Sequence, residues 1–152
     1  MKNIFFYQTS IGEIAIAENK AAITNLYFKG KMPLQDAVIQ ETALLKEAFR
    51  QLEDYFAGKR KFFELPLAPE GTPFQQNVWK ELQQIPYGET RSYGEIGKSI
   101  DQPKAYRAVG MANNKNPILI FIPCHRVIGA NGKLVGYAGG LDVKNHLLKL
   151  EQ

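Results

Sequence analysis

The sequence predicts a mixed α/β (α+β) protein with a small N-terminal α/β domain, residues 1–71, and a mainly helical C-terminal domain, residues 72–152. Three observations predict this organisation. Short segments rich in β-forming residues open the chain, and helix-start signals recur in its second half. Between them, the stretch LPLAPEGTP carries three prolines and a glycine, a composition typical of a linker.

The N-terminal part is predicted to form strands and one helix. The segments NIFFYQTS, EIAIAEN and AAITNLYFKG show the alternation and β-forming residues of strands. Apolar residues at helical spacing predict a helix over residues 44–56, which Gly58 ends, and FFELPL is expected to return as another strand. Because this part contains no His and no Cys, we expect it to be structural.

The C-terminal part carries two capping boxes. Thr72 is followed by Pro73 at the first helical position and by Gln75, and Ser92 is followed by Glu95, so both Thr72 and Ser92 are expected to begin helices. The second helix is expected to end near residue 100. The apolar face of the first helix is predicted to consist of Val78, Trp79 and Leu82.

A further helix is predicted over residues 104–112, after the breaker Asp101-Gln102-Pro103. Two short helices joined by a tight turn, the second of them basic, are typical of a helix-turn-helix, although many such pairs only pack. The dipeptide Asn131-Gly132 predicts a hairpin that would form a wing. A last helix is expected over residues 142–151.

The net positive charge is confined to the C-terminal part. Residues 1–71 carry 9 basic and 9 acidic side chains, whereas residues 72–152 carry 10 basic and 6 acidic ones. No acidic residue lies between Asp101 and Asp142. This asymmetry favours an anionic partner, nucleic acid first, although a solvated basic face is an equally good interpretation of composition alone.

The single cysteine, Cys124, excludes an intramolecular disulfide and suits a reducing compartment. The chain shows neither a leader pattern nor an apolar run of membrane-spanning length, so a cytoplasmic protein is expected. One Cys and two His at these spacings do not make a usual metal ligand set, so no metal and no cofactor are expected.

Cys124 lies in the stretch ILIFIPCHRVIG, where an apolar run predicts a buried strand that Pro123 ends. A lone cysteine after such a run is most often a small core residue. However, His125 and Arg126 follow at once, and cationic neighbours favour thiolate, so a lowered pKa and a reactive thiol are expected. A cysteine protease is an alternative, whereas a thioredoxin-like role would need a second thiol.

Three segments carry a family resemblance. The motif IPCHRVIG, with RAVGMANNKNP before it and GYAGGLDVKNHLLKLE after it, resembles the O6-alkylguanine-DNA alkyltransferases (methylated-DNA–protein-cysteine methyltransferases). The resemblance is close over residues 72–151 and weaker before them. It implies a ribonuclease-H-like N-terminal α/β domain and a C-terminal helical domain of the winged helix-turn-helix type.

The resemblance implies a nucleophile, a base and an orienting residue. Cys124 matches the alkyl acceptor, His125 the histidine that reaches the thiol through a water, and Glu151 the glutamate that orients that histidine. Asn116 matches an asparagine that ties the turn after the recognition helix to the active-site loop. Tyr93 matches a tyrosine that strains a neighbouring phosphate and later donates its proton towards the guanine ring.

DNA contacts and a base pocket are implied in the same way. Arg107 matches the arginine finger that enters through the minor groove and fills the gap left by the flipped nucleotide. The carbonyls of Cys124 and Val127 are expected to accept from the guanine amine. The family commonly has serine after the tyrosine of the pocket, whereas this chain has Tyr137-Ala138. Further DNA contacts are expected from Tyr93, Lys104, Ala108 and Arg126.

The expected function is DNA repair. The resemblance implies transfer of the alkyl group from O6-alkylguanine in double-stranded DNA, with O4-alkylthymine as a further lesion, to Cys124 of a monomer, once per molecule. A non-catalytic damage-binding relative and a winged-helix transcription regulator are the alternatives. The first would lack the acceptor cysteine, and the second would need a dimerisation or effector element that the sequence does not indicate.

Overall fold

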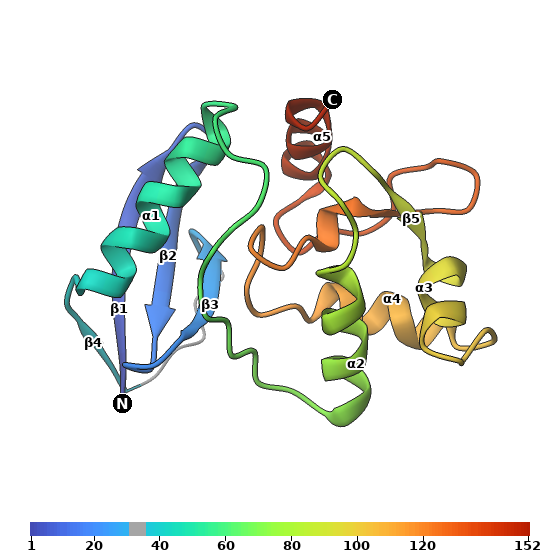
Figure 1. Ribbon diagram of the computed structural model, residues 1–152, viewed down its shortest axis with the longest axis horizontal. Coiled ribbons are helices and arrows are strands. Elements are labelled where there is room, and N and C mark those ends of the chain that lie inside the picture. Colours follow the sequence, from blue (N-terminus) through green and yellow to red (C-terminus); the bar gives the residue numbers. More distant parts are fainter. Residues whose placement is uncertain (31–35) are drawn as a thin grey trace. The chain divides into compact units, whose positions relative to one another are not determined.

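The computed structural model describes residues 1–30 and 36–152, which form two compact units, residues 1–70 and 71–152 (Figure 1). The division falls inside the stretch LPLAPEGTP. The mixed α/β class is confirmed, with a sheet in the N-terminal unit and mainly helices in the C-terminal unit. None of the described helices combines the length and the apolar character needed to cross a bilayer.

The N-terminal unit is built on a four-stranded sheet. The three predicted strands are present and pair antiparallel in chain order. The sequence did not indicate a fourth, three-residue strand, which pairs parallel with the first and exposes Val38 and Ile39 at the sheet edge. The strands are β1 (Lys2–Thr9), β2 (Gly12–Glu18), β3 (Ile23–Phe28) and β4 (Ala37–Ile39), in the order β3-β2-β1-β4.

Helix α1 (Ala43–Phe56) packs on one face of this sheet (Figure 1). The Thr42 side chain caps its start by accepting from the Leu45 N–H, and Gly58 follows its end with a φ of 76°. The helix and its stop were both predicted. Its buried face, which closes the core of the unit, consists of Leu45, Ala48, Gln51, Leu52 and Tyr55.

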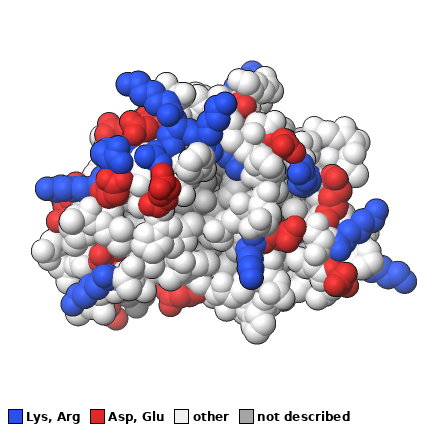
Figure 2. Space-filling model, viewed as in Figure 1, with Lys and Arg blue, Asp and Glu red and all other residues white. Residues whose placement is uncertain are grey.

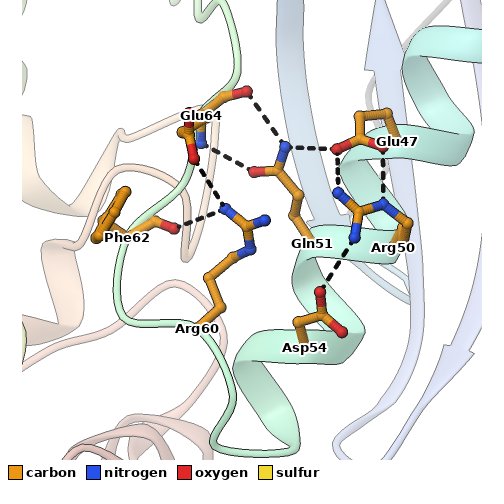
Figure 3. A network of polar contacts seen from close by, with 7 residues as sticks. All are labelled: Glu47, Arg50, Gln51, Asp54, Arg60, Phe62 and Glu64. Atoms are coloured by element: carbon orange, nitrogen blue, oxygen red, sulfur yellow. Dashed lines mark hydrogen bonds and ion pairs between the residues drawn. The ribbon is translucent and has the colours of Figure 1, made fainter.

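The segment FFELPL was predicted to return as a strand, and this prediction is wrong. Its contact with the sheet is a single bridge between Leu67 and Ile23, because Pro66 has no N–H to extend a ladder. The Gln51 side chain of α1 holds the segment instead: its Nε2 donates to the Glu64 carbonyl (3.2 Å) and its Oε1 accepts from the Glu64 N–H (2.9 Å) (Figure 3).

The outer face of α1 carries an ion-pair cluster (Figure 3). Arg50 bridges Glu47 (2.6 Å) and Asp54 (3.2 Å), and its hydrogen bonds, followed by that of Gln51, lower the pKa of Glu47 to about 2. All three ionic groups are solvent-accessible, so such pairs contribute little to stability. The cluster is therefore a solvated charged face, which fits the expected structural role of this part.

The C-terminal unit consists of four helices, a 3₁₀ turn and a two-stranded parallel ribbon among its described residues. Helices α2, α3 and α4 pack against one another, and α5 packs on the 3₁₀ turn (Figure 1). The elements are α2 (Pro73–Leu82), β5 (Arg91–Ser92), α3 (Tyr93–Ser99), α4 (Tyr106–Asn114), η1 (Cys124–Arg126), β6 (Val127–Ile128) and α5 (Leu141–Leu150).

Helix α2 anchors the core of this unit. Both halves of the predicted capping box are present, since Thr72 accepts from the Gln75 N–H and the Gln75 side chain accepts from the Thr72 N–H. The three predicted apolar residues are buried. One of them, Trp79, donates its indole N–H to the Ala112 carbonyl of α4 (2.8 Å), which fixes α4 against α2.

Helices α3 and α4 form the predicted helix pair. Ser92 and Glu95 make the expected capping box at the start of α3. Helix α4 begins two residues later than predicted, because Pro103 lies in a turn. In this turn the Gln102 N–H donates to the Gly97 carbonyl and the Ala105 N–H donates to the Gln102 carbonyl. Lys104 therefore lies in the connecting turn rather than on α4.

The apolar run ILIFI, residues 118–122, is not a strand, so this prediction is wrong. It folds into a buried turn in which Ile122 N–H bonds to Ile118 O (3.0 Å) and Ile120 takes a φ of 71°. The Asn116 amide completes the turn, with Nδ2 donating to Ile122 O (2.8 Å) and Oδ1 accepting from Ile118 N–H (3.0 Å). A side chain thus satisfies backbone groups that a sheet would otherwise pair.

The predicted wing hairpin is also absent from the described residues. Strand β6 pairs in parallel with β5, and no strand follows it. The Asn131-Gly132 turn does form, with Asn131 Oδ1 accepting from the Lys133 N–H (3.2 Å). The segment that follows is rich in glycine, and Gly136 and Gly140 have positive φ values, which do not suit a strand.

The close packing of α3 on the following turn predicts a stability difference between two glycines. A Cβ at Gly97 would lie 2.8 Å from the Gln102 carbonyl oxygen, whereas one at Gly94 meets nothing nearer than 3.9 Å. We expect Gly97→Ala to lower the free energy of unfolding by about 1–3 kcal/mol. Gly94→Ala, the matched control, should leave it unchanged or raise it. Urea unfolding followed by fluorescence of Trp79, the single tryptophan, measures both, and equal effects would contradict this packing.

Candidate active site

Cys124 begins the η1 turn and is buried, with 1 % of its surface exposed. The buried 118–122 turn delivers it: the Cys124 N–H donates to the Ile122 carbonyl (2.8 Å). Its own carbonyl accepts from the Asn113 side chain (3.3 Å) and from the Val127 N–H. Both lone pairs of that carbonyl are thus engaged, so it offers a guanine amine little of the acceptor capacity expected from the sequence.

Burial dominates the titration of the Cys124 thiol. Desolvation raises its pKa to about 11, against smaller lowering effects of a hydrogen bond with Asn116 and of the Lys144 charge. The expectation of a lowered pKa is therefore wrong for this conformation. The physical reason is that Arg126, two residues along the chain, directs its charge to the Glu151 carboxylate, while burial removes the sulfur from water.

His125 and Glu151 form a buried pair. Their Nε2 and Oε2 atoms are 2.7 Å apart, and neither side chain exposes more than 2 % of its surface. Burial lowers the pKa of His125, and the Glu151 carboxylate opposes this effect. A neutral imidazole that donates Nε2–H to Glu151 has its lone pair on Nδ1, a buried atom with no partner among the described protein atoms.

Arg126 shares the same carboxylate. Its Nε and Nη2 bond to Glu151 at 2.8 and 3.0 Å, its Nη1 donates to the Ile85 carbonyl (2.8 Å), and its guanidinium lies over the Tyr87 ring. The side chain is buried. Arg126 therefore has a structural role in place of the expected DNA contact, because its guanidinium is buried and already bonded to groups of the C-terminal unit.

Tyr93 lies close enough to the thiol for the charge of a Cys124 thiolate to act on it. Tyr93 is the first residue of α3 and donates its hydroxyl to the Val135 carbonyl (2.8 Å). Burial raises its pKa, and the charge of the Cys124 thiolate raises it further, so the phenol stays protonated close to the sulfur. Val127 and Tyr137 are buried, and Ala138 is partly buried.

The remaining expected DNA contacts are solvent-exposed. Arg107 and Ala108 lie on the outer face of α4, and Lys104 lies in the turn before it. The Arg107 guanidinium rests 5.9 Å from the centre of the Tyr106 ring. On the face drawn in Figure 2, basic side chains are interspersed with acidic ones.

Comparison with known proteins identifies the family. Residues 73–152 match the family described as 6-O-methylguanine DNA methyltransferase, DNA binding domain, and residues 5–69 match its ribonuclease-like domain. The chain belongs to the 6-O-methylguanine DNA methyltransferases. The resemblance drawn from the IPCHRVIG motif is thereby confirmed.

Individual relatives of this methyltransferase family cover nearly the whole chain. The methylated-DNA–protein-cysteine methyltransferase of Methanosarcina acetivorans is 55 % identical over 95 % of both chains. The constitutive enzyme of that name from Bacillus subtilis is 49 % identical over 95 % of this chain and 92 % of its own. The crystal structure of Mycobacterium tuberculosis OGT in complex with DNA superposes with a TM-score of 0.94 at 47 % identity, covering 98 % and 92 %.

Sequence reasoning missed two residues at the methyltransferase site. Lys144 is wholly buried on α5, and Asn113 donates to the Cys124 carbonyl. A signal for Lys144 was available, because it stands three and four residues before Leu147 and Leu148, at a position that belongs to the apolar face of its helix. No local pattern distinguishes Asn113 from a solvent-facing helix residue.

The buried neutral His125 predicts a pH dependence of stability. In an unfolded chain histidine titrates near about 6.5, and the folded pKa is lower, so the unfolded state binds more protons as pH falls below that value. His125 should therefore remove up to about 1.4 kcal/mol of unfolding free energy per pH unit below about 6.5. Urea unfolding between about pH 5 and pH 7 should show that the unfolding free energy of His125→Gln changes less per pH unit than that of the wild type.

The matched control for this titration is His146→Gln. His146 is the second histidine of the chain and is exposed on α5. The His146→Gln variant should show the same change of unfolding free energy with pH as the wild type. A slope that stays unchanged in His125→Gln, or that flattens equally in both variants, would contradict the proposed neutral state of His125.

Proposed function

We propose that this protein repairs DNA by moving the alkyl group of O6-alkylguanine in double-stranded DNA to Sγ of Cys124, once per molecule. One observation carries the proposal: the single thiol of a member of the methyltransferase family begins the turn that holds the His125–Glu151 pair. The relatives are named for transfer of methyl groups from DNA to a protein cysteine.

The target base has to leave the duplex, because a thiol with 1 % exposure lies beyond the reach of a stacked base. Flipping a nucleotide costs a few kcal/mol, less for a weakly paired alkylated base. Arg107, exposed on α4 with Ala108 beside it and Lys104 in the preceding turn, is proposed to fill the gap and contact the backbone.

The thiol is proposed to lose its proton to His125. Nδ1 of the neutral imidazole is a buried acceptor, and a bridging water would connect it to Sγ. Glu151 then stabilises the imidazolium through its bond to Nε2. Asn116, which holds the 118–122 turn and bonds to the thiol, keeps the sulfur in place.

The transfer itself is a single displacement. The thiolate attacks the alkyl carbon, a C–S bond forms, and the bond to guanine O6 breaks with its electron pair on the base. Tyr93, kept protonated by burial, donates the proton that neutralises the departing guanine. The Tyr93 phenolate then takes up the proton that His125 received from the thiol. Val127, Tyr137 and the backbone N–H of Ala138 are proposed to line the base pocket, so loss of the family's serine hydroxyl leaves that N–H available.

The reaction is proposed to end there. The product is a thioether, which does not hydrolyse readily, and the chain has no second cysteine that could take over the alkyl group. The protein is thus an enzyme by reaction class that acts without turnover, and it needs no cofactor for the displacement. Residues 72–152 contain every group proposed to react, so residues 1–71 are assigned a structural role.

One chain carries the whole proposed site, so a monomer is sufficient. A free thiol survives in a reducing compartment, which supports the cytoplasm as the place of action. O4-alkylthymine is proposed as a further substrate, because its alkyl group is also carried on an exocyclic oxygen that a flipped base would present to the sulfur.

A labelled duplex tests the proposal. Incubation with an oligonucleotide carrying radiolabelled O6-methylguanine should move label to the protein in at most a one-to-one ratio, and intact mass should rise by one methyl group. Cys124→Ala should bind the duplex and accept no label. Repeated turnover, or label transfer to Cys124→Ala, would contradict the mechanism. Binding of the duplex by the wild type without transfer of label would indicate a damage-binding protein.

The proposed finger role of Arg107 predicts a difference between substrates. Arg107→Ala should slow repair of the duplex by about 10- to 100-fold, because the emptied stack is no longer filled, and should affect the free alkylguanine base less. Lys115→Ala, which removes an exposed positive charge just after α4, is the matched control and should have a smaller effect on duplex repair. Equal losses on duplex and free base would contradict a finger role.

A further inference from the structure

Asn113 carries a buried polar atom that the proposed mechanism does not use. It lies in the last turn of α4 and exposes 1 % of its surface. Its Nδ2 donates to the Cys124 carbonyl (3.3 Å), whereas its Oδ1 is buried and has no hydrogen-bond partner among the described protein atoms. This bond fixes the orientation of the amide, because a carbonyl oxygen can accept only from the nitrogen end of the side chain.

An acceptor without a donor is costly in a protein interior. Such an atom has lost its hydrogen bonds to water and gained none in return, and nearly all buried polar groups of proteins are paired for this reason. In the described part of the C-terminal unit, His125 Nδ1 is in the same position, and the proposed mechanism gives it a bridging water. Asn113 Oδ1 is likewise expected to receive a donor from another molecule.

Asn113 lies beside the proposed reaction centre. Its Nδ2 bond places the side chain against the backbone of the acceptor cysteine. One turn earlier on the same face of α4, Gly110 faces the Tyr93 ring, since a Cβ at this glycine would lie 3.9 Å from two ring carbons. A guanine whose O6-alkyl carbon meets Sγ of Cys124 would therefore come to lie next to the Asn113 amide.

O6-alkylguanine offers one kind of donor to such an acceptor. Alkylation at O6 leaves N1 without a hydrogen and the sugar occupies N9, so the exocyclic amine carries the only N–H groups of the base. From the family resemblance, this amine was expected to bond to the carbonyls of Cys124 and Val127. Both lone pairs of the Cys124 carbonyl are engaged, however, one of them by Asn113 itself. Asn113 thus occupies one expected acceptor and presents another, its Oδ1.

We propose that Asn113 is a specificity-determining residue of the base pocket, whose Oδ1 accepts a hydrogen bond from the exocyclic amine of the flipped guanine. The inference rests on the proposed transfer to Cys124 and deepens it by naming a group that reads the base. One N–H of the amine bonds to Asn113, and the other remains for the Val127 carbonyl. The free protein leaves Oδ1 without a donor, and a base that carries the amine supplies one.

This bond separates the two proposed substrates. O4-alkylthymine in DNA has no N–H group, because alkylation at O4 removes the hydrogen from N3 and the sugar occupies N1. Its edge presents only acceptors, which would face Asn113 Oδ1 with no hydrogen between them. A site that is built to pair a substrate N–H rejects an analogue that lacks it, because the buried polar group of the site then stays unpaired. Asn113 should therefore favour O6-alkylguanine over O4-alkylthymine.

Removal of the amine from the base tests the inference. Single-turnover rates are measured on duplexes containing O6-methylguanine or O6-methylhypoxanthine, which is the same base without the exocyclic amine. The wild type should react at least about tenfold faster with O6-methylguanine. Asn113→Leu keeps the branched shape of the side chain without its polar atoms, so it should reduce this ratio about tenfold by slowing the reaction of O6-methylguanine. The difference in flipping cost between the duplexes is common to both proteins and cancels when the ratios are compared.

A second variant and a matched control complete the comparison. Asn113→Met fills the same space with an adaptable apolar chain and should reduce the ratio as Asn113→Leu does. Both variants leave the Val127 N–H on the Cys124 carbonyl, so both are expected to fold, and urea unfolding followed through Trp79 checks this. The control is Asn114→Leu, the same change at the next residue of α4, which is exposed. It should keep the wild-type ratio.

Two results would overturn the inference. A wild-type ratio near one would show that the site does not read the amine. An unchanged ratio in the Asn113 variants, whether or not both rates fall, would show that Oδ1 bonds only a structural water.

Failure of this inference is distinguishable from failure of the proposed function. Transfer that persists in Cys124→Ala would overturn the acceptor assignment, whatever the ratio of the two rates. Transfer that depends on Cys124 but shows a ratio independent of Asn113 would overturn only the role of Asn113.

Discussion

The C-terminal unit depends on one buried carboxylate. Glu151, the penultimate residue, accepts three charge-assisted or ring N–H bonds, one from His125 and two from Arg126. Through them the residue that directly follows α5 is joined to η1, and through the Arg126–Ile85 bond it is joined to the segment after α2. Removing one partner of such a buried pair leaves an uncompensated charge and costs about 3–5 kcal/mol. The orientation of the His125 ring and the packing of the residues after α5 therefore depend on the same carboxylate atoms.

This arrangement explains why a histidine–arginine pair can follow the cysteine without lowering the pKa of its thiol. Arg126 points to Glu151, and His125 is neutral because burial outweighs the carboxylate's effect on its pKa. Neither residue therefore offers a net positive charge to the sulfur in the resting protein. A positive charge comes instead from Lys144 on α5, and burial lowers the pKa of that lysine.

Local signals were predictable from the sequence, and long-range ones were not. The capping boxes at Thr72 and Ser92 and the stop at Gly58 depend on residues within one helical turn, and they appear where predicted. Whether ILIFI becomes a strand depends on a free sheet edge, and the Asn116 amide closes the run into a turn instead. The motif located Cys124, His125 and Glu151, but the burial of Arg126 and Lys144 is set by packing of segments that are distant in sequence. Arginine and lysine side chains are usually exposed to solvent. Arg126 and Lys144 are exceptions, because each forms hydrogen bonds with buried groups of the C-terminal unit.

A buried thiol is a reasonable nucleophile for a protein that reacts once. With a pKa near 11 instead of about 8.5, the thiolate fraction at neutral pH falls by about 300-fold. The intrinsic nucleophilicity of a thiolate rises with its pKa, with a slope of about 0.4–0.5, which recovers about tenfold. The remaining deficit has to be offset by position, and holding two reactants in line can contribute far more than that factor. Residues 135–138, held through the Val135 carbonyl by Lys144 and Tyr93, are suited to supply that alignment to a flipped base. The low thiolate fraction meanwhile protects the sulfur from oxidants and stray alkylating agents. Selectivity thus follows from burial itself: the thiol reacts fast only with an alkyl carbon that the pocket presents to it.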